Sequence, residues 1–97
     1  MQHRFFVTGI GTGVGKTVVS AVLVHALRAA YWKPVQCGDL DDSDTRTIAR
    51  LVPDAVCHPE GYRLREPRSP DAAAAAEGVT IDLDRLVLPP HPDAPLV

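Results

Sequence analysis

The spacing of apolar residues changes along the first third of the chain. Residues 4–8 are mostly aromatic or β-branched and end at a glycine, which is typical of a short buried strand. Residues 17–30 hold neither glycine nor proline and are apolar on nearly every face, which predicts a helix packed on more than one side. Residues 31–36 predict a second short strand, with Pro34 near its edge or end. These elements make one βαβ unit, whose strands we expect to be parallel with a right-handed crossover.

The pattern is looser in the remainder of the chain. A loop rich in aspartate leads into a predicted helix over residues 43–52, with its apolar residues on one face. Residues 62–64 predict a short strand. Ser69 can cap a further helix, whose first residue would be Pro70 and whose body is a run of alanines. Residues 95–97 have the composition of another apolar strand.

Composition narrows the class of protein. The 97 residues include 10 Lys and Arg against 12 Asp and Glu, a formal net charge of −2, with 45% hydrophobic residues. This is ordinary globular composition, and the absence of a basic cluster argues against nucleic acid or a membrane surface as a partner. The longest apolar run, residues 21–24, is far shorter than the roughly 20 residues that span a bilayer, and no secretory signal is visible. The two cysteines and four histidines show no metal-ligand spacing, so we expect a reduced, cytoplasmic chain.

The strongest chemical signal is the glycine-rich turn over residues 9–17, which ends in Gly-Lys-Thr between a predicted strand and a predicted helix. Backbone N–H groups in such a turn form a nest for phosphate oxygens, and the positive end of the helix dipole adds to it. Lys16 would neutralise the β- and γ-phosphates, and the Thr17 hydroxyl would be a ligand of Mg²⁺. We expect ATP to be bound by Gly13, Val14, Gly15, Lys16, Thr17 and Val18. The usual spacing has its first glycine at position 10, whereas here Ile10 stands there and Gly9 opens the turn.

The turn and its flanking elements predict an α/β fold of the P-loop NTPase type, with a mostly parallel sheet and flanking helices. Such a sheet usually has four or more strands with both faces covered, and this sequence offers fewer. We therefore expect residues 1–97 to be the N-terminal portion of a single P-loop nucleotide-binding domain that stops before the next core strand.

Lys33 lies near the carboxyl end of the second predicted strand. Ligands of open α/β sheets bind at such ends, so Lys33 would lie beside the glycine-rich turn. Two lysines there could stabilise a transferring phosphoryl group. Lys33 can also be read as a surface lysine without a catalytic role. Two other residues considered below have structural interpretations that stay open as well: Asp44 as an acid at a helix N-terminus, and Cys37 as a small apolar residue that fills space.

Further segments accompany the turn in a fixed order. The apolar start of the chain, residues 5–9, is followed by Thr-Gly-Val-Gly-Lys-Thr-Val-Val-Ser at residues 12–20 and by Tyr-Trp-Lys-Pro-Val-Gln at residues 31–36, with Gly38 close behind. Ser-Asp at residues 43–44, Glu-Pro-Arg-Ser-Pro at residues 66–70 and Glu-Gly at residues 77–78 come after them. In this order they resemble the dethiobiotin synthetase family, the ATP-dependent ring-closing ligases of biotin synthesis. The resemblance covers almost the whole chain.

The resemblance implies a reaction and a set of roles. One amine of 7,8-diaminopelargonate captures CO₂ as a carbamate, ATP phosphorylates the carbamate, and the second amine closes the ring to give dethiobiotin, ADP and phosphate. Lys33 and Lys16 would be catalytic, and Thr12, Lys33 and Cys37 would contact the diamine. Thr17 and Asp44 would be the Mg²⁺ ligands, with Asp44 also close to ATP. The family is homodimeric.

The sequence departs from the family pattern at Ile10, Gly11, Cys37 and Asp71, where other residues are usual. The family's Glu-Gly-Ala-Gly segment and its adenine-binding residues would come after Val97. We therefore expect the 97-residue chain to be inactive alone and the activity to belong to the complete protein.

Three alternatives stay open at this point. The first is a P-loop ATPase of the partition or septum-placement type, a partner-binding switch, although its signature lysine is absent at Gly11. The second is a ligase similar to cobyrinate synthetase. The third is a remnant without function.

Overall fold

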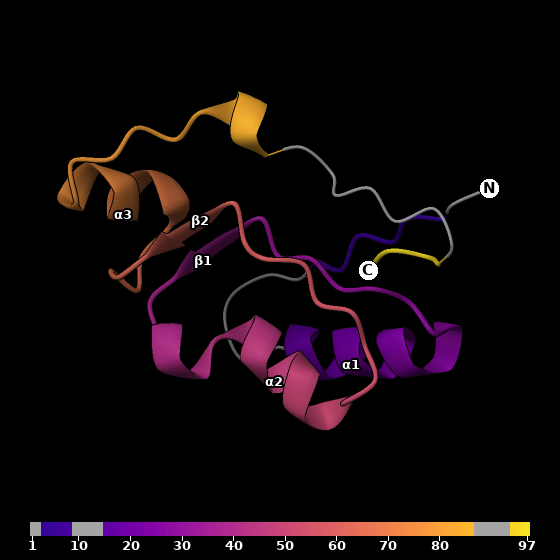
Figure 1. The fold of residues 1–97 in the computed structure, drawn as a ribbon. Coiled ribbons are helices and arrows are strands. Elements are labelled where there is room, and N and C mark those ends of the chain that lie inside the picture. The colour runs from indigo at the N-terminus through magenta and orange to yellow at the C-terminus, as the bar shows by residue number, and fades with distance from the viewer. Residues whose placement is uncertain (1–2, 9–14, 87–93) are drawn as a thin grey trace.

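The computed structural model describes residues 3–8, 15–86 and 94–97. Its helices are α1 (Lys16–Leu27), α2 (Asp44–Leu51) and α3 (Pro70–Ala76), with short 3₁₀ turns η1 (Leu40–Asp42) and η2 (Leu83–Arg85). Strands β1 (Val35–Cys37) and β2 (Tyr62–Leu64) pair in parallel. Figure 1 shows α3 on one side of this pair and α1 with α2 on the other. The arrangement is an α/β fold with a parallel sheet and flanking helices, as predicted.

Single parallel bridges extend the sheet beyond the two named strands. Leu96 bridges Arg4 on one side and Ala30 on the other, so residues 94–97 lie between the two segments that the sequence predicts as the parallel strands of one βαβ unit. The N–H of Phe5 donates to the carbonyl of Leu96 at 2.8 Å, and the N–H of Trp32 donates to that of Val97 at 3.0 Å. Residues 4–8 and 30–32 are therefore parallel through a shared neighbour and do not pair with each other.

Helix α1 ends earlier than the apolar pattern predicts. Arg28 takes a left-handed conformation with φ 51°, and the N–H groups of Arg28 and Ala29 bond back to the carbonyls of His25 and Val24. This C-cap stops the helix at Leu27. The expectation that α1 packs on more than one side is wrong for the described residues. Helix α1 buries one face, which holds Ser20, Ala21 and Val24, and leaves Val18, Val19 and Val22 exposed.

Helix α2 is fastened at its start and buried at one residue. The hydroxyl of its N-cap, Ser43, accepts the N–H of Arg46 at 3.3 Å, and Ser43 is itself 1% exposed. Ile48 is fully buried, whereas Leu51 is exposed, so the apolar face is narrower than its sequence suggests. The helix therefore packs against α1 mainly through Ile48.

Two apolar clusters hold the elements together. The first joins α1 and α2 to the extended segment at residues 29–31 and to Val97. The second joins Tyr62 and Leu64 of β2 to Ala73 and Ala74 of α3, so the alanine run of α3 is a closely packed helix surface. No helix among residues 3–8, 15–86 and 94–97 is long and apolar enough to cross a membrane.

Candidate nucleotide and substrate site

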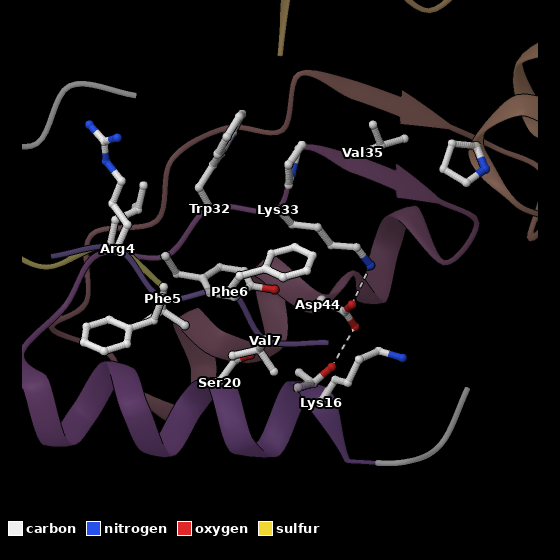
Figure 2. A pocket seen from close by; sticks show the side chains of 16 residues that line it. Arg4, Phe5, Phe6, Val7, Lys16, Ser20, Trp32, Lys33, Val35 and Asp44 are labelled. Atoms are coloured by element: carbon white, nitrogen blue, oxygen red, sulfur yellow. Dashed lines mark hydrogen bonds and ion pairs between the residues drawn. The ribbon is translucent and has the colours of Figure 1, made fainter. Parts of the chain in front are cut away.

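A cavity of about 650 Å³ lies where α1, the segment before β1 and the N-terminal segment meet. Its polar lining comes from Arg4, from the N-terminal half of α1, from Lys33 and from Asp44 at the start of α2. Its apolar walls come from residues 5–7, residues 31–35, Pro70 and the segment that ends at Val97. Figure 2 shows Lys33 pointing toward Asp44 from the segment before β1, with Lys16 nearby at the start of α1. The cavity thus combines a compact charged corner with a long apolar wall.

Asp44 links two parts of the chain that are far apart in sequence. Its Oδ1 accepts the hydroxyl of Thr17 at 3.1 Å, and its Oδ2 accepts the ammonium of Lys33 at 2.5 Å (Figure 2). The side chains of Lys33 and Asp44 are 30% and 40% exposed, so the pair is open to the cavity rather than sealed in the core. One carboxylate therefore holds a hydroxyl and a cation in a fixed relation.

Local structure explains how these three side chains meet. Gly15, with φ 86°, is the N-cap of α1, so Lys16 and Thr17 stand in the first helical turn. Asp44 is the first residue of α2, where its negative charge is favoured by the helix dipole. Lys33 precedes Pro34, whose carbonyl accepts the N–H groups of Gly61 and Tyr62 and so anchors the segment to β2.

The site also affects neighbouring ionisable groups. Burial raises the pKa of Tyr31, and the negative charge of Asp44 raises it further. Tyr31 therefore stays protonated and forms a neutral wall of the cavity. Burial also raises the pKa of Cys37, which the positive charge of Lys33 partly opposes. The Cys37 thiol is thus not activated as a nucleophile.

The donor set at the start of α1 and α2 fits a magnesium ion. Mg²⁺ prefers hard oxygen ligands and usually takes only one or two from protein, with waters and phosphates completing its shell. The Thr17 hydroxyl and the Asp44 carboxylate are such ligands, and they already lie within hydrogen-bonding distance of each other. Within the described part of the chain, no cluster of three or more His, Cys, Asp or Glu side chains offers a different kind of metal site.

The structure brings together four of the residues predicted from sequence: Lys16, Thr17, Lys33 and Asp44 all line the cavity. Thr12, Gly13 and Val14 lie outside the described residues.

Three further predicted residues in the described part of the chain do not line the cavity. Gly15 is the N-cap of α1. Val18 is 61% exposed on α1. Cys37 packs against the cluster around Tyr62 and Leu64 instead.

Sequence reasoning gave no role to the aromatic side chains that form the apolar wall. Phe5, Phe6, Tyr31 and Trp32 all border the cavity. Trp32 is oriented by its Nε1, which donates to the carbonyl of Pro59 at 3.1 Å. Their position in the sequence could have indicated this role for two of them, because Tyr31 and Trp32 immediately precede Lys33 in the same extended segment.

Comparisons with known proteins find one matching family model and several similar proteins. A family model described as an AAA domain matches residues 3–97. A protein of Agrobacterium fabrum strain C58 is 52% identical over 99 residues, covering 100% of this chain and 46% of that protein. A protein of Rhodopseudomonas palustris strain HaA2 is 54% identical over 99 residues, with the same coverage of 100% and 46%. A protein of Chlamydia pneumoniae is 49% identical over 88 residues, covering 91% of this chain and 40% of that protein.

All three relatives carry the name ATP-dependent dethiobiotin synthetase BioD. The chain spans less than half the length of each of them.

Proposed function

The chain belongs to the AAA domain family, and we propose that the protein it represents is an ATP-dependent dethiobiotin synthetase. The proposed enzyme joins 7,8-diaminopelargonate and CO₂ into the cyclic urea of dethiobiotin and converts ATP to ADP and phosphate. The observation that carries the proposal is the hydrogen-bonded series Thr17–Asp44–Lys33 beside Lys16 in one cavity. The names of the similar proteins support the same chemistry.

The nucleotide would lie at the start of α1. Successive N–H groups of the glycine turn through Val18 would bind the phosphates, and Lys16 would lie against the β- and γ-phosphates. Thr17 and Asp44 would hold Mg²⁺, which when bound neutralises phosphate charge and orients the terminal phosphoryl group. This arrangement would put the transferable phosphoryl group near Lys33.

Lys33 would act in the transfer of the phosphoryl group to the carbamate. The carbamate formed from one substrate amine and CO₂ is an anion, and so is the phosphoryl group that it receives. An ammonium held in the cavity stabilises both as a point charge, and Asp44 keeps that ammonium in place. When the second amine attacks the carbonyl of the mixed anhydride, phosphate leaves and the ring closes. Positioning and charge neutralisation therefore supply most of the catalysis.

The remaining expectations form part of the proposal. Thr12 would touch the diamine, whereas Cys37, which packs in the second apolar cluster, would not. The enzyme would act as a homodimer on small molecules in the cytoplasm, with no nucleic acid or membrane partner. The near-neutral formal charge of −2 and the two free cysteines support this description. The 97-residue chain alone would not turn over, since it spans less than half the length of its relatives.

Substrate-dependent ADP release by the complete natural polypeptide tests the proposal. With Mg²⁺ and ATP present, we expect ADP release to require both 7,8-diaminopelargonate and bicarbonate, and dethiobiotin to appear in equal amount by mass spectrometry. ADP release that ignores the diamine and responds instead to DNA or to a protein partner would favour the partition-type switch and refute the proposal.

A further inference from the structure

The loop between β2 and α3, residues 65–69, is fastened by a side chain that the proposed chemistry does not use. Glu77 Oε2 accepts the backbone N–H of Arg65 at 2.8 Å and that of Glu66 at 3.4 Å. Its Oε1 accepts Nε of Arg65 at 3.1 Å. One carboxylate at the end of α3 therefore satisfies two backbone donors at the start of the loop.

The burial of this carboxylate shows that the contact is more than a surface ion pair. The Glu77 side chain is 12% exposed, whereas that of Arg65 is 80% exposed. Burial by itself raises the pKa of Glu77, but hydrogen bonds from the Arg65 side chain and from the N–H groups of Arg65 and Glu66 lower it below its ordinary value. Glu77 is therefore ionised at neutral pH, and its charge is stabilised mainly by the loop that it holds.

The loop also contacts Gly38, the residue that follows β1. A Cβ atom added at Gly38 would lie 2.8 Å from Cβ of Pro67 and 2.9 Å from its Cα, so only glycine allows this contact. Gly38 is fixed in turn, because its N–H donates to the carbonyl of Leu64 at 2.8 Å. The loop is thus held at two points, by the Glu77 carboxylate and by the surface of Gly38.

The loop leads directly into the cavity. Pro70 follows it, begins α3 and lines the cavity together with Lys33 and Val35. Figure 2 shows Val35 on the opposite side of Asp44 from Lys16, so this wall borders the part of the cavity away from the nucleotide end. The part of the ligand that meets Pro70 would therefore be the diamine rather than the triphosphate.

We propose that Glu77 is a positioning residue for diamine binding: its carboxylate holds residues 65–69 so that Pro70 forms the wall of the cavity beside Val35. The inference rests on the proposed function. Glu77 itself touches no reacting atom and acts through the loop.

The test compares Glu77→Gln with Asp84→Asn in the complete natural polypeptide. The first variant keeps the shape of the side chain but removes its charge and replaces one of its two acceptor oxygens by an NH₂ donor. The N–H groups of residues 65 and 66 and Nε of Arg65 can then no longer all be accepted. The second removes an equal charge from an exposed residue of η2 for which the described residues give no contact with the loop. Amide hydrogen exchange at residues 65 and 66, and the KM for diamine and for ATP, are measured for both. The melting temperature of each variant is measured alongside.

For Glu77→Gln we expect exchange at residues 65 and 66 to accelerate about tenfold or more. We expect the KM for diamine to rise about tenfold, with the KM for ATP within about twofold of the wild type. Asp84→Asn should change neither quantity. Unchanged loop exchange, an unchanged diamine KM, or equal rises in both KM values with a collapse in melting temperature each overturn the inference. If the wild type shows no diamine-dependent turnover at all, the proposed function fails, and the exchange measurement still decides whether Glu77 holds the loop.

Discussion

Helices α2 and α3 both follow a serine and carry an aspartate within their first two residues, yet their starts are built differently. At α2, Ser43 is buried and its hydroxyl accepts a helix N–H. At α3, Ser69 is exposed and its hydroxyl donates to the Asp71 carboxylate at 2.8 Å instead of capping the helix.

The difference follows from the residue after each serine. Asp44 brings a backbone N–H that needs a capped first turn, whereas Pro70 has no N–H and begins its helix with one orphan donor fewer. With its first turn capped by Ser43, α2 can turn the Asp44 carboxylate toward Thr17 and Lys33. The start of α3 is held from outside, through Glu77 and the preceding loop. Similar sequence signals therefore produce a charged corner in one place and a passive wall in the other.

The largest expected effect comes from the charged corner. In Asp44→Asn, the negative charge that faces the Lys33 ammonium is lost, and the single amide oxygen cannot accept from both Lys33 and Thr17. We expect kcat for diamine-dependent ADP release to fall roughly 100- to 1000-fold, the range seen when a preorganised electrostatic contact is removed. Asp41→Asn, which removes an equal charge from exposed η1, is the control. An Asp44→Asn enzyme within a few-fold of wild-type kcat would show that the corner is dispensable.

The second-largest effect concerns the contact between Gly38 and Pro67, in the loop that leads to Pro70. Gly38→Ala should lower the free energy of unfolding by about 2 kcal/mol, because a Cβ would overlap Pro67 and φ is +72°. Gly78→Ala is a matched control, since Gly78 has φ +68° but nothing within 4 Å of its added Cβ. It should cost only about 1 kcal/mol through backbone strain alone. Urea unfolding measures both, and equal losses would mean that Pro67 gives way freely.

The two serines can be compared directly. Ser43→Ala should lower the free energy of unfolding by about 1 kcal/mol, because a buried cap is lost. Ser69→Ala, at an exposed position without a capping bond, should stay within about 0.5 kcal/mol of the wild type. Thermal unfolding distinguishes them, and a larger loss for Ser69→Ala would reverse our account of the two helix starts.

The smallest expected effect is a change in the pKa of Asp71. The hydrogen bond from Ser69, followed by those from the N–H groups of Ala72 and Asp71, lowers the pKa of Asp71. Because the pKa of Asp71 is lower in the folded state than in the unfolded state, the ionised carboxylate stabilises the fold. This stabilisation is present above the unfolded pKa and is lost as the pH falls through the folded pKa. Ser69→Ala should therefore raise the pKa of Asp71 toward its ordinary value in a carboxyl NMR titration. A pKa that stays depressed would assign the effect to the backbone bonds alone.

Local pattern predicted much of this fold. The helix around residues 17–30, the short strand at residues 62–64 and the helix beginning at Pro70 are all present, because each depends on neighbouring residues. The early end of α1 was not predictable, since it depends on Arg28 taking a left-handed conformation that the sequence does not favour. The sheet order was not predictable either, because residues 94–97 enter between two segments that are close in sequence.

The residues of the candidate site also differ in whether neighbouring or distant parts of the chain bring them into place. Lys16 and Thr17 could be predicted from a contiguous motif. The contact between Lys33 and Asp44 depends on how the chain turns through β1 and η1, and only the family resemblance brought them together in advance. Cys37 lies two residues beyond Val35 in β1, and packing against α3 takes its side chain into the second apolar cluster rather than to the cavity.

Lys33→Ala in the complete natural polypeptide tests the central claim most directly, through Mg–ATP affinity and diamine-dependent ADP release measured on the same preparation. If Lys33 stabilises the carbamate and the phosphoryl group it receives, the variant will bind Mg–ATP with affinity close to that of the wild type. It will release ADP at least about 100-fold more slowly when diamine and bicarbonate are present. Release at the wild-type rate would contradict the claim that this lysine and the Asp44 carboxylate form the reaction centre.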